Sequence, residues 1–413
     1  MVKGKVMRCL YFTGGRVLSW VNRLIPKEEK RICFFCKSGI NDNSEAMLSH
    51  LLEFKYQEEF EIVCIVSDPE PYRRYEKEGV RLVGLFHGLR ELMRCKYIFC
   101  HGENLAIMPT KDQISVNYWH GTPLKKINRM LPKLGKYKYD FFTYITASSE
   151  LFRPIFAEAF GCDPSRVLIN GHPRNDYLFR VSPALLLMGI RKEEYNKVFL
   201  WMPTYRMSRD GLIQDTNGKN LENAGVPVFH TTKELEALDR FLRRYNCLLF
   251  LKLHPAQRLE KVAWGSYERI KILTNDELDR KGIRLYQILK ESDALLTDYS
   301  SVFFDYLLLD RPVGFVLEDL GEYQDRRGFV FENPLDFMPG EKIYDKSQLY
   351  HFLKMCLDGR DRWGEERARV NSMVNVCKGR KNCRMLLEQI GLTRQEAGKK
   401  NERNDQTVDQ THL

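Results

Sequence analysis

The chain has 413 residues, which exceeds the roughly 250 to 300 residues at which a single core usually divides, so two domains are expected. Hydrophobic residues make up 43% and charged residues 29%, an ordinary globular composition that excludes a largely disordered chain. The formal net charge of +10 indicates an anionic partner. The charge alone does not show whether this partner is a nucleotide, a phosphorylated substrate, a nucleic acid or an anionic lipid.

Two further compositional features concern the cellular compartment. No stretch approaches the ~20 apolar residues of a transmembrane helix, and no secretory signal peptide with a cleavage site is evident. The eleven cysteines have no paired framework spacing, which favours reduced thiols in a cytoplasmic setting. Cys33 and Cys36 form one C-x-x-C, but without a second Cys or His pair at zinc spacing we expect neither metal nor redox function there.

The first 30 residues form a basic segment of unusual composition. Apolar residues such as Trp20 and Leu24 alternate with basic residues such as Arg16 and Arg23. Cations beside Trp and Leu on one helix are typical of a segment lying in the plane of an anionic membrane surface. The alternative is a helix that packs on the protein's own core and exposes a basic face. We predict a membrane-surface helix over residues 1–30.

Short apolar runs alternate with helical patterns after Pro26. Helical patterns such as SEAMLSHLLEF and SSELFRPIFAEAF separate several of these runs. Such alternation predicts an α/β fold with a parallel sheet covered on both faces. The runs expected to be strands are Ile32 to Phe35, Ile62 to Val66, Val80 to Leu85, Tyr97 to Cys100, Ile114 to Tyr118, Tyr144 to Ala147 and Val167 to Ile169.

A second α/β series begins near residue 197 with KVFLWMP, CLLFLKLHP, DALLTD and PVGFVL. Between the first two lies a predicted helix in which Thr231 and Glu234 have capping-box spacing. We therefore expect two Rossmann-like domains that face each other across a cleft, with the ligand at the carboxyl ends of the strands. The expected segments are 1–30, 31–186, 187–375, and 376–413, the last comprising a helix end and a disordered tail.

Three segments stand out between or after these domains. The joint is expected within Ser182 to Asn196, and Asp210 to Gly225 is predicted to be a long polar loop able to move. Helix is expected from about Trp363 to Ile390. The final residues, from RQEAGKK onwards, are nearly free of apolar side chains and are predicted to be disordered.

Polar residues follow several predicted strands directly, in both halves of the chain. They are HGTP after Tyr118, NGHPRND after Ile169, PTYR after Met202, HP after Leu253 and TDYSS after Leu296. Because the carboxyl ends of parallel strands meet at one sheet edge, a single cleft could gather them all.

The TDYSS segment has a specific physical interpretation. Ser300 and Ser301 open a predicted helix, whose free N–H groups and dipole, with two hydroxyls, favour a phosphate. The simpler interpretation is that Ser300 only caps the helix. Asp305 lies four residues after Ser301, on the same helical face, where it could reach a ribose or polyol hydroxyl or simply be solvated.

Several function classes lack their motifs. There is no G-x-x-x-x-G-K-[ST], no G-x-G-x-x-G after a strand and no G-x-S-x-G, which disfavours P-loop NTPases, dinucleotide dehydrogenases and α/β-hydrolases. No D-x-D motif or His/Asp cluster indicates a metal. Phosphate charge would be met by helix N-termini, histidines and cations such as Lys252, Arg174 and Arg206. The spread of Lys and Arg, without a recognised motif, argues against nucleic-acid binding.

Two of the nine histidines stand out by position. His120 and His254 each follow an apolar strand and precede a proline-bearing turn, one in each half. This placement makes a catalytic function as plausible as a structural one. His101 and His172 also follow strands and are weaker candidates.

Taken together, five motifs carry a family resemblance. In order they are YWHGTPLKKI, NGHPRND, MPTYR, LKLHP and TDYSSVFFDYLLLDRP followed by EYQDRRGF. This set resembles the CDP-glycerol glycerophosphotransferase family, the teichoic acid primases and polymerases, over roughly residues 30 to 375. One departure is His172, where tyrosine is frequent in the family, and it bears on donor or acceptor preference.

The resemblance implies a GT-B-like fold and a transferase. The implied reaction moves glycerol phosphate, or a related polyol phosphate, from CDP-glycerol to a hydroxyl of a lipid-linked or polymeric glycan and releases CMP. The first domain would take the acceptor and the second the CDP-polyol. His120 would be the base and His254 would stabilise the pyrophosphate and the departing CMP. The matching donor positions are Trp119, Gly121, Thr122, Pro123, Arg174, Pro203, Thr204, Lys252, Leu253, Ser300, Ser301 and Asp305.

The resemblance also sets expectations for location and partners. A lipid-linked acceptor requires an enzyme at the cytoplasmic face of the cell membrane, which agrees with the basic N-terminal segment. The expected partners are therefore the donor, the glycan acceptor and the membrane surface, with no nucleic acid. No cofactor and no protein-bound metal are expected, and a divalent ion accompanying the donor is left open. The alternatives are a GT-B glycosyltransferase using a nucleotide sugar and a non-catalytic binding protein.

Overall fold

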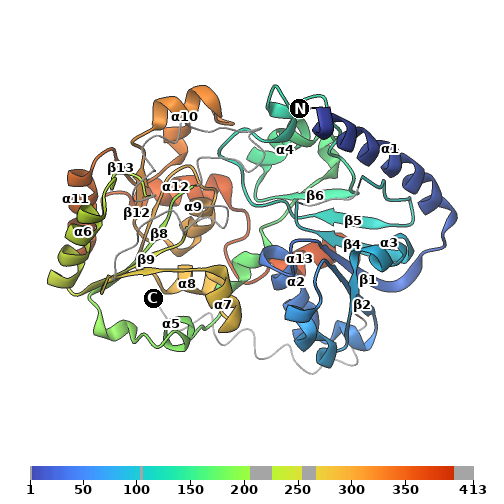
Figure 1. Cartoon of the computed structure of the whole chain (residues 1–413), viewed down its shortest axis with the longest axis horizontal. Helices are drawn as coiled ribbons and strands as arrows, with labels where there is room; N and C mark the ends of the chain where they lie inside the picture. Colours follow the sequence, from blue (N-terminus) through green and yellow to red (C-terminus); the bar gives the residue numbers. More distant parts are fainter. Residues whose placement is uncertain (1, 103–105, 205–225, 254–266, 395–413) are drawn as a thin grey trace.

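The computed structural model describes residues 2–102, 106–204, 226–253 and 267–394, with side chains from residue 13 onwards. Two parallel β-sheets divide these residues into halves, seen on the right and left of Figure 1. The first sheet has seven strands in the order β3-β2-β1-β4-β5-β6-β7, and the second has six in the order β10-β9-β8-β11-β12-β13. The prediction of two parallel α/β halves is therefore confirmed.

The inner strands of both sheets contain short apolar runs that are mostly buried, whereas the outer strands β3, β7 and β10 are only partly buried. In β2, EIVCIV, every residue after Glu61 is buried, as expected where helices cover both faces of a parallel sheet. The strands are β1 Glu28–Cys36, β2 Glu61–Val66, β3 Val80–Gly84, β4 Cys95–Cys100, β5 Ile114–Asn117, β6 Tyr144–Ala147, β7 Val167–Ile169, β8 Lys197–Met202, β9 Cys247–Leu251, β10 Ile270–Ile272, β11 Ala294–Thr297, β12 Val313–Val316 and β13 Glu341–Ile343. The predicted strands all form, whereas β10 and β13 were missed because each has only three residues and a lysine at its centre.

The helices of the described residues cover the two sheets. They are α1 Val2–Leu24, α2 Asp42–Glu53, α3 Leu85–Arg94, α4 Arg153–Phe160, α5 Ala184–Leu187, α6 Thr232–Arg244, α7 Asn275–Arg280, α8 Leu285–Glu291, α9 Val302–Tyr306, α10 Leu320–Arg326, α11 Lys346–Leu357, α12 Gly364–Val374 and α13 Asn382–Gln389. The predicted capping box is present in α6, where Thr231 accepts from the Glu234 N–H and Glu234 bonds back to the cap.

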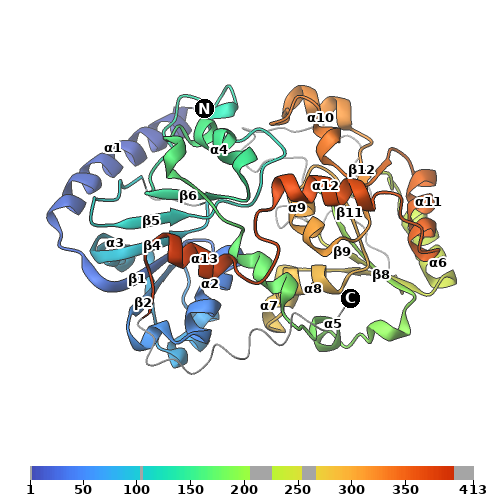
Figure 2. The same cartoon turned by 180° about the vertical axis from the view of Figure 1, so that it is seen from behind.

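The C-terminal helical region is interrupted, contrary to the expectation of helix from Trp363 to Ile390. After α12 the chain leaves the second half, and the Val376 N–H donates to the Ser148 carbonyl at 2.9 Å. Helix α13 then packs beside α2 on the first half (Figure 2). Asp176 caps its start by accepting from the Asn382 and Cys383 N–H groups at 3.0 and 3.2 Å. The chain therefore crosses between the halves a second time.

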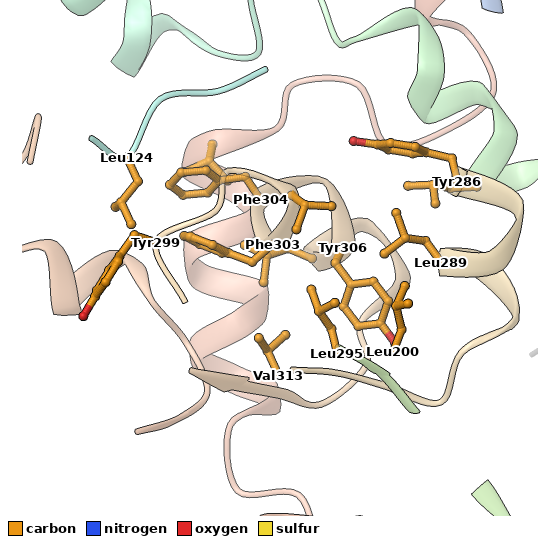
Figure 3. Close-up of a cluster of buried hydrophobic side chains, with 14 of the residues drawn as sticks. Leu124, Leu200, Tyr286, Leu289, Leu295, Tyr299, Phe303, Phe304, Tyr306 and Val313 are labelled. Atoms are coloured by element: carbon orange, nitrogen blue, oxygen red, sulfur yellow. The ribbon is translucent and has the colours of Figure 1, made fainter. Parts of the chain in front are cut away.

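The two halves also share one hydrophobic core. Leu124 follows β5 in the first half, yet it is fully buried in the cluster built around α9, together with Tyr299 and Phe304 (Figure 3). Two backbone hydrogen bonds continue this contact, from Lys126 N–H to Gly328 O at 3.1 Å and from Val330 N–H to Leu124 O at 2.9 Å. The segment after β5 is thus embedded in the second half.

The N-terminal helix presents an unusual face to solvent. Within its described part, Ser19 and Asn22 are buried against the protein, whereas Trp20 and Leu24 are 61% and 64% exposed. Asn22 donates to the Gln113 side chain at 2.7 Å, which explains why a polar residue faces inward. Among the helices of the described ranges, none has both the length and the apolar character needed to span a bilayer.

Candidate active site at the facing sheet edges

The carboxyl ends of β4 and β5 form the base of the candidate site. The Tyr118 N–H donates to the Cys100 carbonyl at 2.9 Å, so the two strand ends lie side by side. The Asn117 Oδ1 accepts the Gly102 and Trp119 N–H groups at 3.2 and 2.8 Å. One amide oxygen therefore holds both turns that leave the sheet, and Trp119 adopts a positive φ of 55° in its turn.

His120 and His101 contact each other at this edge. The distance between His120 Nδ1 and His101 Nε2 is 3.2 Å, within hydrogen-bond range. His120 is exposed, whereas the His101 side chain is 16% exposed. Gly102, at φ +69°, permits this approach, because a Cβ there would lie 2.4 Å from the His120 ring. The sequence ranked His101 below His120, although both directly follow strands.

Arg174 is the hub that connects this edge to the second half. It lies in the 3-10 helix Pro173–Phe179, and its Nη1 donates to both Asp42 oxygens at 3.0 and 2.8 Å and to the His120 carbonyl at 3.1 Å. Its Nη2 donates to Asp305 Oδ2 at 2.8 Å. Burial would lower the pKa of Arg174, but the charges of Asp42 and Asp305 and the Tyr286 hydroxyl raise it overall, so the guanidinium stays charged.

The sequence suggested that Asp305 either contacts a ligand hydroxyl or is solvated, and the structure places it in neither environment. It is 1% exposed, and it accepts hydrogen bonds from Arg174, from Asn175 Nδ2 at 3.0 Å and from the Tyr286 hydroxyl at 2.5 Å. Both carboxylate oxygens are thus engaged, so Asp305 is neither solvated nor open to a polyol hydroxyl in this structure. It joins the halves beneath the site.

A buried polar cluster supports the HGTP turn from below. The Thr122 hydroxyl lies 2.8 Å from the Ser148 hydroxyl and 3.1 Å from His172 Nε2, and all three residues are fully buried. Burial lowers the pKa of His172 to about 4, so its ring is neutral near pH 7. The residue that departs from the family pattern therefore lies beneath the turn.

The second half contributes the ends of β8 and β9. The Thr204 N–H donates to both Asp298 oxygens at 3.1 and 2.9 Å, and its hydroxyl also donates to Asp298. Pro203 and Leu253 are buried in this edge. Lys252 is 7% exposed, and burial lowers its pKa; among the described residues, its Nζ donates to the Leu253 carbonyl at 3.4 Å. A buried ammonium with one long hydrogen bond is suited to an anionic ligand.

The start of α9 lies against the HGTP turn. Gly121 has φ +123°, and a Cβ at this position would lie 2.4 Å from Arg174 Nη2 and 3.3 Å from the Ser301 hydroxyl. The carboxyl edges of the two sheets therefore face each other here, as the motif positions predicted. The N-cap of α9 is Ser301 rather than Ser300, to which the simpler interpretation had assigned the cap, and the Ser301 side chain makes no capping hydrogen bond. Pro123 and Thr122 are buried in the same turn.

Some predicted features lie outside the described residues. These are His254, Arg206, the polar loop Asp210 to Gly225 and the C-terminal tail from residue 395. Their contributions to the site stay predictions.

One buried cluster was not foreseen from sequence spacing. His50, Asp176 and Cys383 bring potential metal-ligand atoms within 4.8 Å of one another. However, the Asp176 oxygens already accept N–H groups at the start of α13, and burial lowers the pKa of His50 to about 4. This arrangement fits a structural anchor for α13.

Cys33 and Cys36 are both buried in β1, where burial raises the pKa of the Cys33 thiol.

Comparison with known proteins decides the family. Residues 17–391 match the model of the CDP-glycerol:poly(glycerophosphate) glycerophosphotransferase family. The chain belongs to this family. The resemblance of the five motifs is therefore confirmed, and the chain is a glycerophosphotransferase-like enzyme of teichoic acid biosynthesis.

Curated relatives refine this membership. The chain is 30% identical over 213 residues to the teichoic acid glycerol-phosphate primase of Bacillus subtilis (strain 168), a match covering 51% of this chain and 49% of the primase. It is 28% identical over 346 residues to the teichoic acid poly(glycerol phosphate) polymerase of Bacillus spizizenii, covering 77% of this chain and 82% of the polymerase. The chain thus matches about half the length of the primase. Ribitol-phosphate enzymes also match, so the family-level reaction is glycerol- or ribitol-phosphate transfer to a teichoic acid chain.

Solved structures agree on the fold. The wall teichoic acid polymerase TagF with CDPG superposes with a TM-score of 0.70 at 20% identity, covering 94% of this chain and 95% of that chain. A putative UDP-N-acetylglucosamine 2-epimerase from Listeria monocytogenes gives 0.53 at 14% identity, covering 88% and 96%. The two-domain, GT-B-like arrangement is therefore confirmed.

Proposed function

We propose that the chain transfers glycerol phosphate, or a related polyol phosphate, from CDP-glycerol to a hydroxyl of a lipid-linked or polymeric glycan and releases CMP. The observation that carries the proposal is the contact between the HGTP turn and the start of α9, where Gly121 approaches Ser301. A donor phosphate at Ser300 and Ser301 would then lie beside the turn that carries His120. Family membership supplies the reaction class.

In the proposed reaction, the acceptor hydroxyl oxygen attacks the β-phosphorus of the CDP-polyol. Its proton moves to His120, a new phosphate ester bond forms, and the bond from the β-phosphorus to the CMP oxygen breaks. Charge develops on phosphate oxygens, so positioning and electrostatic stabilisation supply most of the rate enhancement. Lys252 and the hydroxyls of Ser300 and Ser301 are the described groups proposed to meet that charge, and His254 is proposed to stabilise the departing CMP.

The other predicted donor positions have supporting roles in this proposal. Trp119, Gly121, Thr122 and Pro123 shape the turn beside the phosphates, and Pro203, Thr204 and Leu253 shape the opposite edge. Arg174 and Asp305 hold the two edges together through their mutual ion pair. No cofactor is proposed, and a divalent ion that arrives with the donor is compatible with this scheme.

A donor screen tests the proposal. Purified protein is incubated with a lipid-linked glycan acceptor and CDP-glycerol, CDP-ribitol or a UDP-sugar, and nucleotide release is measured. We expect CMP from a CDP-polyol, with loss of activity in His120→Ala. Release of UMP or UDP from a UDP-sugar, or full activity in His120→Ala, would contradict the proposal and favour the nucleotide-sugar alternative.

We further propose that α1 rests on the cytoplasmic face of the membrane, where a lipid-linked acceptor is presented. Supporting this, Trp20 and Leu24 are exposed beside the exposed Arg16 and Arg23. These α1 residues border a groove of about 660 Å³. The groove is lined by Arg16, Ser19, Trp20, Arg23, Ala106, Met108, Lys136, Tyr137, Lys138 and Phe141. Cations beside aromatic rings suit anionic headgroups.

Vesicle sedimentation tests the membrane proposal. The full chain should sediment with vesicles containing anionic phospholipid and less with purely zwitterionic vesicles. Trp20→Ser combined with Arg23→Ser should reduce this binding, while Leu186→Ser, which alters an exposed leucine on α5, should not. Unchanged sedimentation of the α1 variant would exclude α1 as the contact.

A further inference from the structure

The segment that follows the HGTP turn carries a run of cations without a carboxylate. Residues 120–140 read HGTPLKKINRMLPKLGKYKYD, and Asp140 is the first acidic residue after the turn. The cations that precede it are Lys125, Lys126, Arg129, Lys133, Lys136 and Lys138. The candidate active site contains none of them, so this concentrated positive charge has a different partner.

The fold separates the apolar side chains of this segment from the basic ones. Leu124 and Leu131 are 0% and 9% exposed, so apolar side chains anchor the segment in the core. The cations between and after them are exposed to solvent. We call four of them the basic strip, namely Lys126, Arg129, Lys133 and Lys136.

Consecutive backbone turns hold the strip. The Leu131 N–H donates to the Asn128 carbonyl at 3.0 Å, and the Leu134 N–H donates to the Leu131 carbonyl at 2.9 Å. The Tyr137 N–H then donates to the Leu134 carbonyl at 3.1 Å. Because the backbone is ordered before a ligand arrives, binding to the strip costs less conformational entropy than binding to a free loop would.

The protein does not neutralise the charge of the strip. Lys138, which lies just beyond it, pairs with Asp140 at 3.5 Å. Within the part of the chain that the structure describes, the four cations of the strip form no ion pair. Neighbouring charges of one sign repel each other and attract counterions, so a ligand with several anionic groups relieves the repulsion.

The two ends of the strip lie at two different features of the molecule. Lys126 comes shortly after the HGTP turn and lies beside the end of α10, where a Cβ on Gly328 would be 3.2 Å from its Cδ. Lys136 lines the groove beside α1 together with Trp20 and Arg23. Both α10 and α1 lie along the upper side of the molecule in Figure 1. The strip therefore connects the turn that carries His120 with the α1 groove.

We propose that the basic strip binds the phosphodiester backbone of the acceptor polymer, between its lipid-linked end and the hydroxyl that reacts. The inference rests on the proposed function and adds the surface that holds the acceptor. Every repeat of a polyol-phosphate polymer contains an anionic phosphodiester, so successive phosphates contact successive cations. With the lipid end at α1, the chain passes along the strip to the HGTP turn.

The composition of the strip favours a polymer over a membrane surface. Segments that lie on membranes combine cations with exposed apolar side chains that enter the lipid, as Trp20 and Leu24 of α1 do in the membrane proposal. Among residues 121–141, by contrast, no large hydrophobic side chain is exposed. The strip offers charge without an inserting group, which suits a hydrated polyanion.

The proposal makes binding depend on the length of the acceptor. A single phosphate contacts part of the strip, whereas a longer chain contacts several cations at once, so affinity should rise with the number of repeats. These contacts are exposed, and salt should weaken them. The chain is therefore expected to prefer acceptors that already carry several polyol-phosphate units.

Fluorescence anisotropy with the full chain, without donor, tests this surface. The probes are labelled glycerol phosphate and a labelled, water-soluble glycerol-phosphate oligomer of about ten units. The wild type should bind the oligomer more tightly. Lys126→Glu combined with Lys133→Glu should weaken oligomer binding by about 10-fold.

The matched control changes the net charge equally at another surface. Lys233→Glu combined with Arg240→Glu alters exposed cations on α6, which lies at the opposite end of the molecule from α1 (Figure 1). This variant should retain oligomer binding. Equal losses in the two variants, or equal affinity of the wild type for both probes, would overturn the inference.

Kinetics and vesicle sedimentation separate the acceptor from the membrane. With the donor identified by the screen, the Lys126 and Lys133 variant should raise the KM for the oligomer acceptor about 10-fold without changing the KM for the donor. Loss of sedimentation with anionic vesicles at unchanged oligomer affinity would instead assign the strip to the membrane and overturn the inference. If the wild type releases no CMP from any CDP-polyol, the proposed function fails, and the anisotropy result still decides whether the strip binds a polyanion.

Discussion

The Arg174 guanidinium joins the two halves of the molecule by donating to Asp305 Oδ2 at 2.8 Å, with side chains only 6% and 1% exposed. Removal of the Asp305 carboxylate leaves three buried donors without their acceptor, namely Arg174 Nη2, Asn175 Nδ2 and the Tyr286 hydroxyl, and of the described carboxylates only Asp42 then pairs with the buried guanidinium. Asp305→Ala should therefore lower the free energy of unfolding by about 3 to 5 kcal/mol. Urea denaturation followed by circular dichroism measures this change.

The control for this prediction is an exposed ion pair. Arg369 pairs with Glu366 on the surface of α12, where solvent screens the charges, so Arg369→Ala should change stability little. Equal effects of the two substitutions would show that the Arg174 to Asp305 contact is not desolvated in solution.

Gly121 should be intolerant of any side chain. At φ +123° an alanine is strained, and its Cβ would also collide with Arg174 Nη2 at 2.4 Å. Gly189 also has a positive φ (+76°), but no atom lies within 4 Å of the Cβ position, so Gly189→Ala is strained without the collision. Backbone strain should lower the free energy of unfolding of both variants by about 1 kcal/mol. Only Gly121→Ala should lose transferase activity. Comparable activity in both would exclude the collision.

Two buried histidines should make stability depend on pH. Burial lowers the pKa values of His172 and His50 from 6.5 to about 4, so both are neutral in the folded chain. Between these values the unfolded chain binds more protons, and stability present above pH 6.5 is lost as pH falls towards 4. When the pH falls from 7 to 5, each histidine should lower the free energy of unfolding by up to about 2 kcal/mol.

Substitution tests this pH dependence. His172→Gln and His50→Gln cannot titrate, so the urea midpoint of each variant should fall less steeply between pH 7 and 5 than that of the wild type. His87→Gln alters an exposed histidine and should retain the wild-type slope. Parallel slopes for all four proteins would show that the two rings are not held neutral.

Leu124 tests whether the halves form one cooperative unit. It is fully buried in the cluster that surrounds α9, although it belongs to the segment after β5. Leu124→Ala should cost about 2 to 5 kcal/mol, with a single unfolding transition. Leu186→Ala, at a leucine 63% exposed on α5, should change stability by no more than about 0.5 kcal/mol. Two separate transitions in the wild type would contradict a shared core.

The local sequence was sufficient to predict much of the fold. Apolar runs bounded by polar turns predicted eleven of the strands, because a strand buried on both faces needs consecutive apolar residues. The three-residue strands β10 and β13 carry too few apolar side chains for that signal. The capping box at Thr231 was predictable for the same local reason, since its two partners are three residues apart.

The candidate site was predictable only in part. Motif order located the HGTP turn and the TDYSS segment and indicated the family, because residues after parallel strands gather at one edge. No local pattern connected Asp42 to His101. Nor did any connect Arg174 to Asp305, which lies 131 residues further along the chain. Whether Asp305 faces a ligand or a buried arginine depends on how the two halves pack. In the structure Asp305 pairs with Arg174 across the two halves and is not open to a ligand.

The sequence by itself determined the alternation of strand and helix, the two parallel sheets and the family, because these depend on residue periodicity and on motifs a few residues long. Only the tertiary structure decided that α13 returns to the first half, that α1 turns Trp20 outward and Asn22 inward, and that His101 contacts His120. These features arise from contacts between distant segments, whose free energy depends on shape and burial that no short stretch of sequence encodes.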